Sequence, residues 1–234
     1  MIYKIADLIT EIPTADGLAV RCQDYLYDQE CTPDIVVRRE LYRWDRFGPA
    51  VKKESVAYME AAAQFYRQLL LFNGFYLHAS AVVRDGKAYL FSGRSGVGKS
   101  THTRLWIDIF GGDTRVINDD KPALRYMDGV WYVYGTPWCG KDGINLNERA
   151  PLAGICFLKQ AQRTQIRHVE SIEALQKILG QTMYQMHDVQ YLDALLQHLQ
   201  LLLKQIPIYE LENQPEPAAA RLSYETMSQG IVGV

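Results

Sequence analysis

The chain has 234 residues, of which 48% are hydrophobic and 22% charged, and its formal net charge is −2. This size and composition are typical of one large, well-packed domain, or of a domain with a small appendage. The near-neutral charge argues against an electrostatic grip on nucleic acid or on an anionic membrane.

Residues 1–53 are predicted to form short strands and turns. Two β-rich stretches, 2–9 and 19–27, flank a turn at 14–17, and a further strand is expected at 40–44. This stretch carries no motif that we can assign. We therefore treat it as a small β-rich N-terminal segment.

A larger domain is predicted over residues 54–234, and it opens with a helix. Apolar side chains recur at helical spacing over 54–72. Two strands follow, 75–83 and 88–92, on either side of Asp85-Gly86. An Asp-Gly pair between two apolar runs is a strong signal of a β-hairpin, so these strands are expected to pair.

The rest of this domain alternates between strands and helices. We expect strands at 115–118, 123–127, 130–134, 155–158 and 206–211, and helices at 100–110, 171–184, 188–204 and 214–227. Alternation of this kind predicts an α/β fold in which helices flank a mixed sheet.

Cysteine usage and the start of the chain favour a cytoplasmic protein. The four cysteines form no CxxC pair and no metal-ligand spacing with the five histidines, which favours free thiols in a reducing compartment. The first residues do not resemble a signal peptide, and no apolar run approaches the roughly 20 residues of a membrane span. We therefore expect neither a membrane nor a nucleic-acid partner.

The stretch between strand 88–92 and helix 100–110 reads GRSGVGKS and fits the phosphate-loop pattern G-x-x-x-x-G-K-S/T in full. The residues predicted to bind nucleotide are Gly93, Arg94, Ser95, Gly96, Val97, Gly98, Lys99, Ser100 and Thr101. Glycines let backbone N–H groups turn around a phosphate, and the positive end of the following helix faces the same anion.

Two side chains of this loop are predicted to act on the bound triphosphate. Lys99 would reach the β- and γ-phosphates, and the hydroxyl of Ser100 would ligate Mg²⁺. The motif thus predicts binding of ATP, or of another nucleoside triphosphate, together with Mg²⁺. The alternative is a glycine-rich turn that binds nothing.

Asp119 and Asp120 follow the strand 115–118, about twenty residues after Lys99. In a parallel β-α-β unit the carboxyl ends of both strands meet at one edge, where ligands bind. A carboxylate there suits Mg²⁺ or takes the proton of a hydroxyl. Side chains alternate along a strand, so the two acids are expected to face different ways. Both are catalytic candidates, Asp120 is also a candidate metal ligand, and the identity of the base stays open.

His78 is predicted to lie beside the loop. A two-residue turn at Asp85-Gly86 pairs Arg84 with Lys87, and this register sets His78 opposite Gly93. The imidazole would then bind a phosphate or assist proton transfer. A structural histidine held by hydrogen bonds is the alternative.

Residues 135–149 form a long, polar, glycine-rich stretch that is predicted to lie near the site. Lys141 or Arg149 would offset the charge of a transferring phosphoryl group, and Glu148 is a candidate ligand of Mg²⁺. An ordinary surface loop fits the same composition.

The run LHASAVVRDGKAYLFSGRSGVGKSTHTRLW, followed by INDD, resembles the catalytic domain of HPr kinase/phosphorylase. It also resembles the related nucleotide core of ATP-dependent phosphoenolpyruvate carboxykinase. Both families carry a histidine on the strand before the loop strand, the loop G-x-S-G-x-G-K-S/T and an Asp-Asp pair. These features match His78, residues 93–100 and residues 119–120, and the resemblance covers about 75–125.

The resemblance implies a P-loop domain with the mixed sheet of these families. In the kinase family one aspartate of the pair is the base or acid for an acceptor serine. The histidine and the lysine contact phosphate, and the loop serine helps to hold Mg²⁺. Short proteins of this kind accompany peptide-modification systems, which implies a serine of a peptide or protein as acceptor. HPr kinases are typically hexameric, which implies a homo-oligomer.

We therefore expect an Mg²⁺-dependent phosphotransferase that moves the γ-phosphoryl of ATP, or of another triphosphate, to a hydroxyl. Two alternatives remain. One is a regulatory module that binds nucleotide without transferring phosphate, and the other is a lyase of carboxykinase type.

Overall fold

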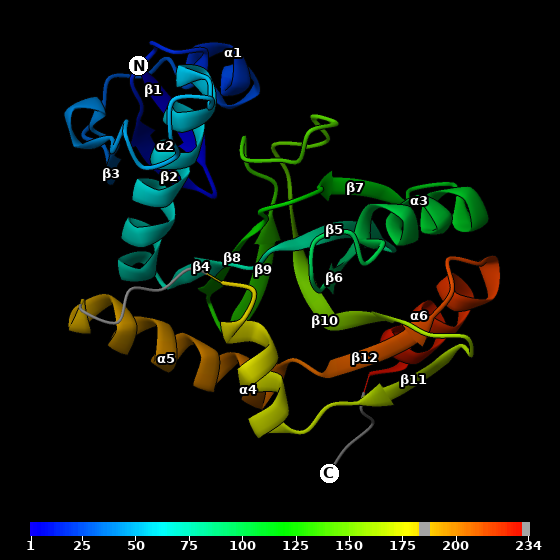
Figure 1. Ribbon diagram of the computed structural model, residues 1–234. Coiled ribbons are helices and arrows are strands. Elements are labelled where there is room, and N and C mark those ends of the chain that lie inside the picture. Colours follow the sequence, from blue (N-terminus) through cyan, green and yellow to red (C-terminus); the bar gives the residue numbers. More distant parts are fainter. Residues whose placement is uncertain (183–187, 231–234) are drawn as a thin grey trace.

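The computed structural model describes residues 1–182 and 188–230. It contains a three-stranded sheet near the N-terminus and a nine-stranded mixed sheet with helices packed against it (Figure 1). The predicted α/β class, with a mixed sheet, flanking helices and a small β-containing N-terminal part, is confirmed. Within the described residues, no helix has both the length and the apolar character that crossing a bilayer requires.

The small sheet has three short strands. They are β1 (Ile2–Ile5), β2 (Leu8–Glu11) and β3 (Ile35–Val36). β1 and β2 form an antiparallel hairpin, and β3 pairs with β2 in parallel. The predicted strand over residues 2–9 is therefore two strands, because the chain reverses at Ala6 and Asp7, which both have positive φ.

The predictions of strands at 19–27 and 40–44 are wrong. These regions contain helix α1 (Leu18–Arg21) and the 3-10 helices η1 (Gln23–Tyr25) and η2 (Arg39–Leu41). In the first region Leu18, Cys22 and Tyr25 are buried. Their spacing of four and three residues puts them on one helical face, so burial outweighs the β propensity of the stretch.

Helix α2 (Lys53–Leu69) was predicted and continues into the 3-10 helix η3 (Leu70–Phe72). Its buried face, which includes Ala57, Ala61 and Phe65, shares one core with the small sheet. Trp138 of the large domain belongs to the same core. The boundary between residues 53 and 54 stays a prediction.

The large sheet has the strand order β4-β8-β9-β10-β6-β5-β7, with β12 paired to β10 and β11 paired to β12. Its strands are β4 (Gly74–Tyr76), β5 (Ala79–Arg84), β6 (Lys87–Ser92), β7 (Arg115–Asn118), β8 (Ala123–Met127), β9 (Val130–Tyr134), β10 (Arg149–Gln160), β11 (Gln165–His168) and β12 (Ile208–Asn213). β10 is the central strand: it is parallel to β6 and β12, and its first residues pair antiparallel with β9.

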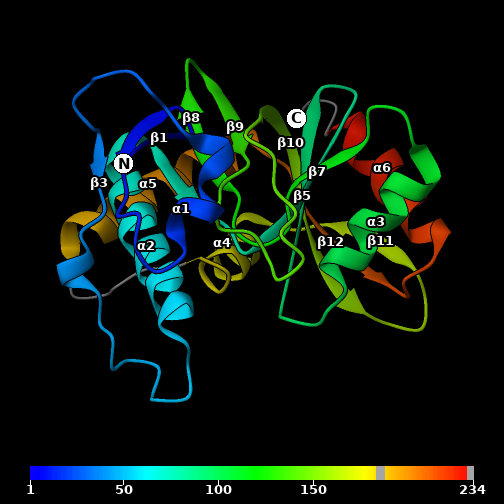
Figure 2. The same cartoon turned by 90° about the horizontal axis from the view of Figure 1, so that it is seen from above.

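Four helices cover the two faces of the large sheet. They are α3 (Lys99–Phe110), α4 (Ser171–Leu179), α5 (Val189–Gln205) and α6 (Pro217–Gln229). α3 and α6 pack over one face and α4 and α5 over the other. Figure 2 shows α3 and α6 on one side of the molecule and α2 with the small sheet on the other. Successive side chains of β6 pack on opposite faces of the sheet. Tyr89 and Phe91 belong to the core under α3, and Ala88 and Leu90 belong to the core under α4.

Other predicted elements differ in their limits, and the strand expected at 155–158 is part of the longer β10. The strand expected at 75–83 is divided at Leu77 and His78, because β4 pairs with β8 whereas β5 pairs with β6 and β7. The helix expected at 171–184 ends at Leu179, and the last two residues of that prediction lie outside the described residues.

The predicted parallel unit around the glycine-rich loop has an additional strand in it. β5 lies between β6 and β7 and is antiparallel to both, so β6 and β7 run in the same direction. Their carboxyl ends therefore meet at the start of β5. Ala79 pairs with Ser92 and Ala81 with Asn118, so the glycine-rich loop and the two aspartates begin at the same edge of the sheet.

Candidate functional site

The glycine-rich loop joins the end of β6 to the first turn of α3. Gly93, Gly96 and Gly98 have φ angles of 143°, 79° and 107°, in the region that L side chains rarely adopt. A Cβ on Gly93 would lie 3.1 Å from the carbonyl oxygen of Leu158, so β10 packs closely against the loop. Glycine is therefore required here by backbone conformation and by the neighbouring strand.

The ammonium group of Lys99 lies inside the curve of this loop. Its Nζ donates to the carbonyl oxygens of Gly93 at 3.1 Å and Arg94 at 3.4 Å. Burial lowers the pKa of Lys99, and the charges of Asp120 and Asp119 partly offset this effect. The same ammonium can exchange these carbonyls for phosphate oxygens, which are stronger acceptors.

A cavity of about 410 Å³, here called the phosphate cavity, opens above the loop and the first turn of α3. Its lining residues are His78, Ser95, Gly96, Gly98, Lys99, Ser100, Thr101, Asp119, Asp120, Gly140, Lys141 and Asp142. The structure thus brings together all four predicted catalytic residues and most of the predicted nucleotide-binding loop. Unpaired N–H groups at the start of α3 make this an electropositive end suited to an anion.

His78 lies between the glycine-rich loop and the two aspartates, and all of them line the phosphate cavity. The predicted register is confirmed from Arg84–Lys87 to Ala79–Ser92, and His78 is the next residue. Its Nε2 lies 3.3 Å from Oδ1 of Asp120, and its Nδ1 lies 3.1 Å from the side-chain amide of Gln181. The ring is therefore held from both sides.

The two aspartates have different surroundings, as the sequence argument expected. Asp120 contacts His78 and forms an ion pair with Lys121. Burial raises the pKa of Asp120, but hydrogen bonds from His78 and Lys121 outweigh burial, so the pKa lies below its ordinary value. Oδ1 of Asp119 is buried and has no hydrogen-bond partner among the described residues. Asp119 therefore has an unused acceptor beside the cavity, whereas Asp120 is held as an ionised carboxylate.

Asn118 orients this pair of acids. Its Oδ1 accepts hydrogen bonds from the backbone N–H groups of Asp120 at 3.0 Å and Lys121 at 2.7 Å. Its Nδ2 donates to the carbonyl oxygen of Thr136 at 3.0 Å. The chain therefore leaves the strand at Asn118 in a turn closed by this side chain, a common use of asparagine.

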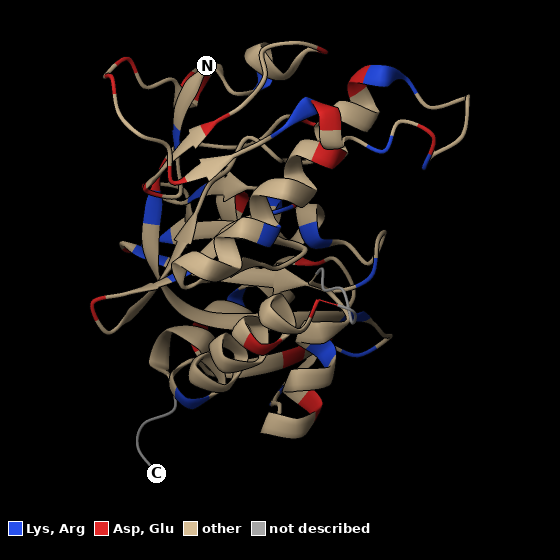
Figure 3. Ribbon diagram, turned by 90° about the vertical axis from the view of Figure 1, so that its left-hand side faces the viewer, with Lys and Arg blue, Asp and Glu red and all other residues tan. Residues whose placement is uncertain are grey.

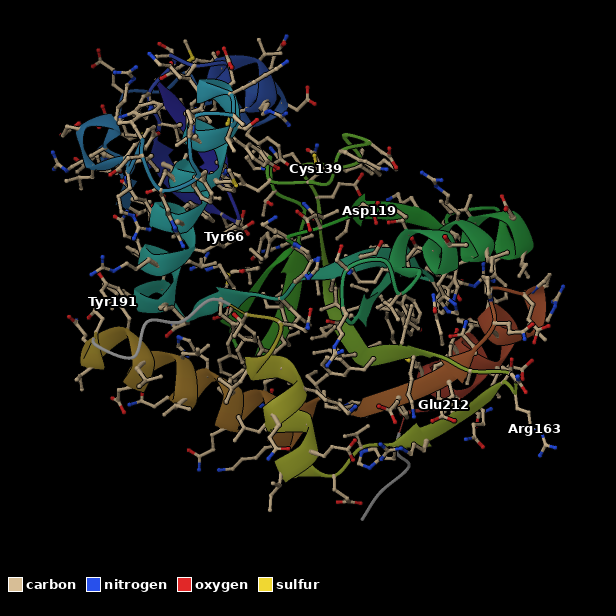
Figure 4. All side chains as sticks on the ribbon, viewed as in Figure 1. Tyr66, Asp119, Cys139, Arg163, Tyr191 and Glu212 are labelled. Carbon is tan, nitrogen blue, oxygen red and sulfur yellow. The ribbon has the colours of Figure 1, made fainter. Side chains whose placement is uncertain are left out.

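The stretch 135–149 only partly matches its prediction. Its middle reaches the phosphate cavity through Gly140, Lys141 and Asp142, and Figure 4 shows Asp119 near the part that carries Cys139. Lys141 is thus placed where a phosphate contact was expected.

The end of this stretch is not brought to the cavity, which corrects two predictions. Glu148, predicted as a ligand of Mg²⁺, forms an ion pair with Arg115 at 2.7 Å. Arg149, predicted as a phosphate contact, is the first residue of β10 and forms an ion pair with Asp7. The pairing of β10 with β9 directs the chain away from the loop at this point.

Three residues of the site were not predicted. Asn118 and Lys121 flank the aspartate pair, and an Asn-Asp-Asp-Lys turn is a local signal that could have indicated both. Gln181 follows His78 by 103 positions and reaches it only through the packing of α4. Nothing in the local sequence marks it.

Ser100 and Asp119 are the residues available for a metal ion. Within residues 1–182 and 188–230, no group of three or more His, Cys, Asp or Glu side chains is arranged to hold a metal. Mg²⁺ commonly binds through one or two protein oxygens together with substrate phosphates, so a full protein cage is not required. Asp119, whose Oδ1 has no partner among the described residues, and Ser100 line the same cavity and fit this pattern.

Comparisons with known proteins add little about function. A scan against protein-family models and a search of curated proteins both found no match. Among solved structures, the HPr(Ser) kinase/phosphatase from Coxiella burnetii aligns with 66% of this chain and 91% of its own, at 14% identity. The TM-score is 0.40, and a likeness at this level carries no argument about function.

Proposed function

We propose that this protein is a phosphotransferase that moves the γ-phosphoryl group of ATP, or of another nucleoside triphosphate, to the hydroxyl of a serine in a peptide or protein. One observation carries the proposal: residues of the phosphate-loop motif, including Lys99, line a single cavity together with His78 and the Asp119-Asp120 pair. Phosphoryl transfer needs little besides positioning and charge stabilisation, and these groups provide both.

The loop and Lys99 bind the triphosphate in this proposal. Backbone N–H groups of the loop and of the first turn of α3 surround the phosphate oxygens. Bound Mg²⁺ would offset the charge that develops on those oxygens, and Ser100 and Asp119 are the residues that would hold it. Asp119 takes the place of Asp120 in this role, because Oδ1 of Asp119 has no hydrogen-bond partner among the described residues.

Asp120 is the base in this proposal. As the acceptor oxygen bonds to the γ-phosphorus, the bond between that phosphorus and the bridging oxygen breaks, and a nucleoside diphosphate leaves. The proton of the acceptor hydroxyl passes to the carboxylate of Asp120, which is ionised at neutral pH because its pKa is low. His78 positions this carboxylate and lies close enough to the loop to contact the transferring group.

Two substitutions test the assignment. Lys99→Ala is expected to lower transfer from γ-labelled ATP to mixed serine peptides by about a hundredfold or more, because it removes a cation from the transferring oxygens. Asp120→Asn is expected to lower transfer while nucleotide still binds, because it removes only the proton acceptor. Lys87→Ala, at the exposed first residue of β6, is the matched control and should transfer normally.

Three outcomes would contradict the proposal. Full transfer by Lys99→Ala would remove the loop from the reaction. Nucleotide-dependent stabilisation of the wild-type protein without any labelled product would favour a regulatory module. Nucleotide-dependent decarboxylation of oxaloacetate would favour a lyase.

A further inference from the structure

A second cavity, of about 680 Å³, lies against the glycine-rich loop and is here called the flanking cavity. It shares Ser95 and Gly96 with the phosphate cavity, so the two adjoin at the tip of the loop. Its other walls come from β10, β12 and the end of α4. Phe157 in its wall belongs to the core under α4, which places the cavity on the sheet face opposite α3.

The position of the flanking cavity fits an acceptor better than a nucleoside. Its loop residues are the first five, Gly93–Val97, and none of its lining comes from α3. Lys99, Ser100 and Thr101, which are predicted to bind the nucleotide, all line the phosphate cavity. The flanking cavity therefore adjoins the phosphate cavity on the side of the loop that α3 does not cover.

One row of contacting side chains leads from the phosphate cavity to the flanking cavity. Asp120 and His78 line the first, Gln181 lines the second, and His78 contacts both of its neighbours. A hydroxyl held where the two cavities adjoin would lie next to both the proposed base and the γ-phosphate. A nucleoside in the flanking cavity would gain nothing from this row.

The lining also indicates the chemistry of the occupant. Arg94, Lys159 and Lys177 line the flanking cavity, against one carboxylate, Glu210. Glu210 pairs with Arg167 and Lys177, and Lys159 pairs with Glu212, so Arg94 is the lining cation for which the described residues provide no ion pair. Figure 3 shows acidic and basic residues interspersed along the chain. The cavity lining itself carries three cationic side chains and one carboxylate.

Amide side chains complete the lining. Gln160, Gln176 and Gln181 each offer both a donor and an acceptor, which match the alternating N–H and C=O groups of a peptide backbone. A cavity of 680 Å³ is within the range of about 300–1,000 Å³ that ligand sites occupy.

We propose that the flanking cavity binds the acceptor as a peptide segment that carries acidic residues beside its serine. This inference rests on the proposed function, and it adds the place and the charge of the substrate. The serine oxygen would bond to the γ-phosphorus where the two cavities adjoin. The nucleoside diphosphate would leave through the phosphate cavity, and Asp120 would take the proton.

Gly180→Leu tests the location. Gly180 lines the flanking cavity and has φ −69° and ψ −11°, which any L residue adopts. A Cβ there would lie 3.5 Å from the carbonyl oxygen of Gln176, an ordinary contact. The variant should therefore fold and occupy part of the cavity. Ser171→Leu, at the other end of α4 and outside this cavity, adds the same side chain as a control.

Two binding measurements separate the substrates. One uses a fluorescent, non-hydrolysable ATP analogue, and the other uses labelled serine peptides with acidic, neutral or basic flanks in the presence of that analogue. Gly180→Leu is expected to weaken binding of the acidic peptides by more than about tenfold and to leave nucleotide affinity within about twofold. Lys159→Gln is expected to reduce the preference for acidic over neutral peptides.

Several results would overturn the inference. They are equal peptide binding by wild type and Gly180→Leu, a preference for neutral or basic flanks, and no peptide binding by the wild type. Loss of nucleotide affinity alone in Gly180→Leu would instead identify a nucleoside site. If acidic peptides bind in the expected way but wild-type protein transfers no phosphate, the cavity assignment stands and the proposed reaction fails.

Discussion

His102 lies in α3, directly after the glycine-rich loop, and a buried contact connects it to α6. Its ring packs against Phe91, and its Nε2 lies 3.0 Å from the hydroxyl oxygen of Ser223. That hydroxyl donates to the carbonyl oxygen of Ala220 and accepts from the indole N–H of Trp106. With its single hydrogen used, Ser223 can only accept from His102, so the proton sits on Nε2. Nδ1 is left bare, and it has no partner among the described residues.

This histidine makes stability depend on pH. Burial lowers the pKa of His102 from 6.5 to about 4. The unfolded chain therefore binds the proton more tightly, and stability falls as pH drops from about 6.5 toward 4. The contribution between pH 7 and pH 5 is about 2 kcal/mol.

The measurement is urea unfolding at these two pH values. His102→Gln keeps a donor for Ser223 and cannot titrate, so its free energy of unfolding should fall by about 2 kcal/mol less than that of the wild type. The same pH dependence in both proteins would contradict the assignment.

At the scale of elements, β7 ends where Asn118 turns the chain, and the site depends on that turn. Asn118→Ala would leave the N–H groups of Asp120 and Lys121 without their acceptor. We expect the free energy of unfolding to fall by about 2 kcal/mol, the cost of unsatisfied polar groups. Transfer should fall by about tenfold to a hundredfold, because Asp120 loses its orientation.

Chemical denaturation and the transfer assay check this expectation together. Asn147→Ala is the matched control, since Asn147 is exposed and its side chain bonds only to the carbonyl oxygen of Asp24 among the described residues. Normal transfer by Asn118→Ala would show that the turn does not hold the base.

The elements around the loop could be predicted because their signals are local. The Asp85-Gly86 turn determines the register of β5 and β6, and the loop motif defines the start of α3. The same register predicted that His78 lies beside the loop, and His78 lines the phosphate cavity. The β propensity of residues 19–27 led to a wrong strand prediction, because Leu18, Cys22 and Tyr25 are buried and follow a helical spacing.

Long-range packing accounts for what could not be predicted. Gln181 reaches His78 only because α4 covers the sheet, and Glu148 is separated from the cavity because β10 pairs with β9. Neither arrangement leaves a local pattern in the sequence. The flanking cavity is likewise invisible there, since its walls come from four distant parts of the chain.

At the scale of the whole molecule, the small N-terminal sheet supports the site through α2. The hydroxyl of Tyr66 donates to the carbonyl oxygen of Lys121 and contacts the hydroxyl of Thr136. Lys121 in turn pairs with Asp120. Tyr66, which belongs to the core that α2 shares with the small sheet, is thus linked to the proposed base through Lys121.

The central claim is that the loop around Lys99 holds a triphosphate with Mg²⁺, and thermal unfolding with and without Mg²⁺ and ATP tests it most directly. Wild type and Lys87→Ala should gain several degrees, because a ligand that binds only the folded state stabilises it. Lys99→Ala, compared with its own ligand-free melting temperature, should gain almost nothing. An equal gain in Lys99→Ala would mean that the nucleotide binds elsewhere, or without this lysine, and would contradict the account.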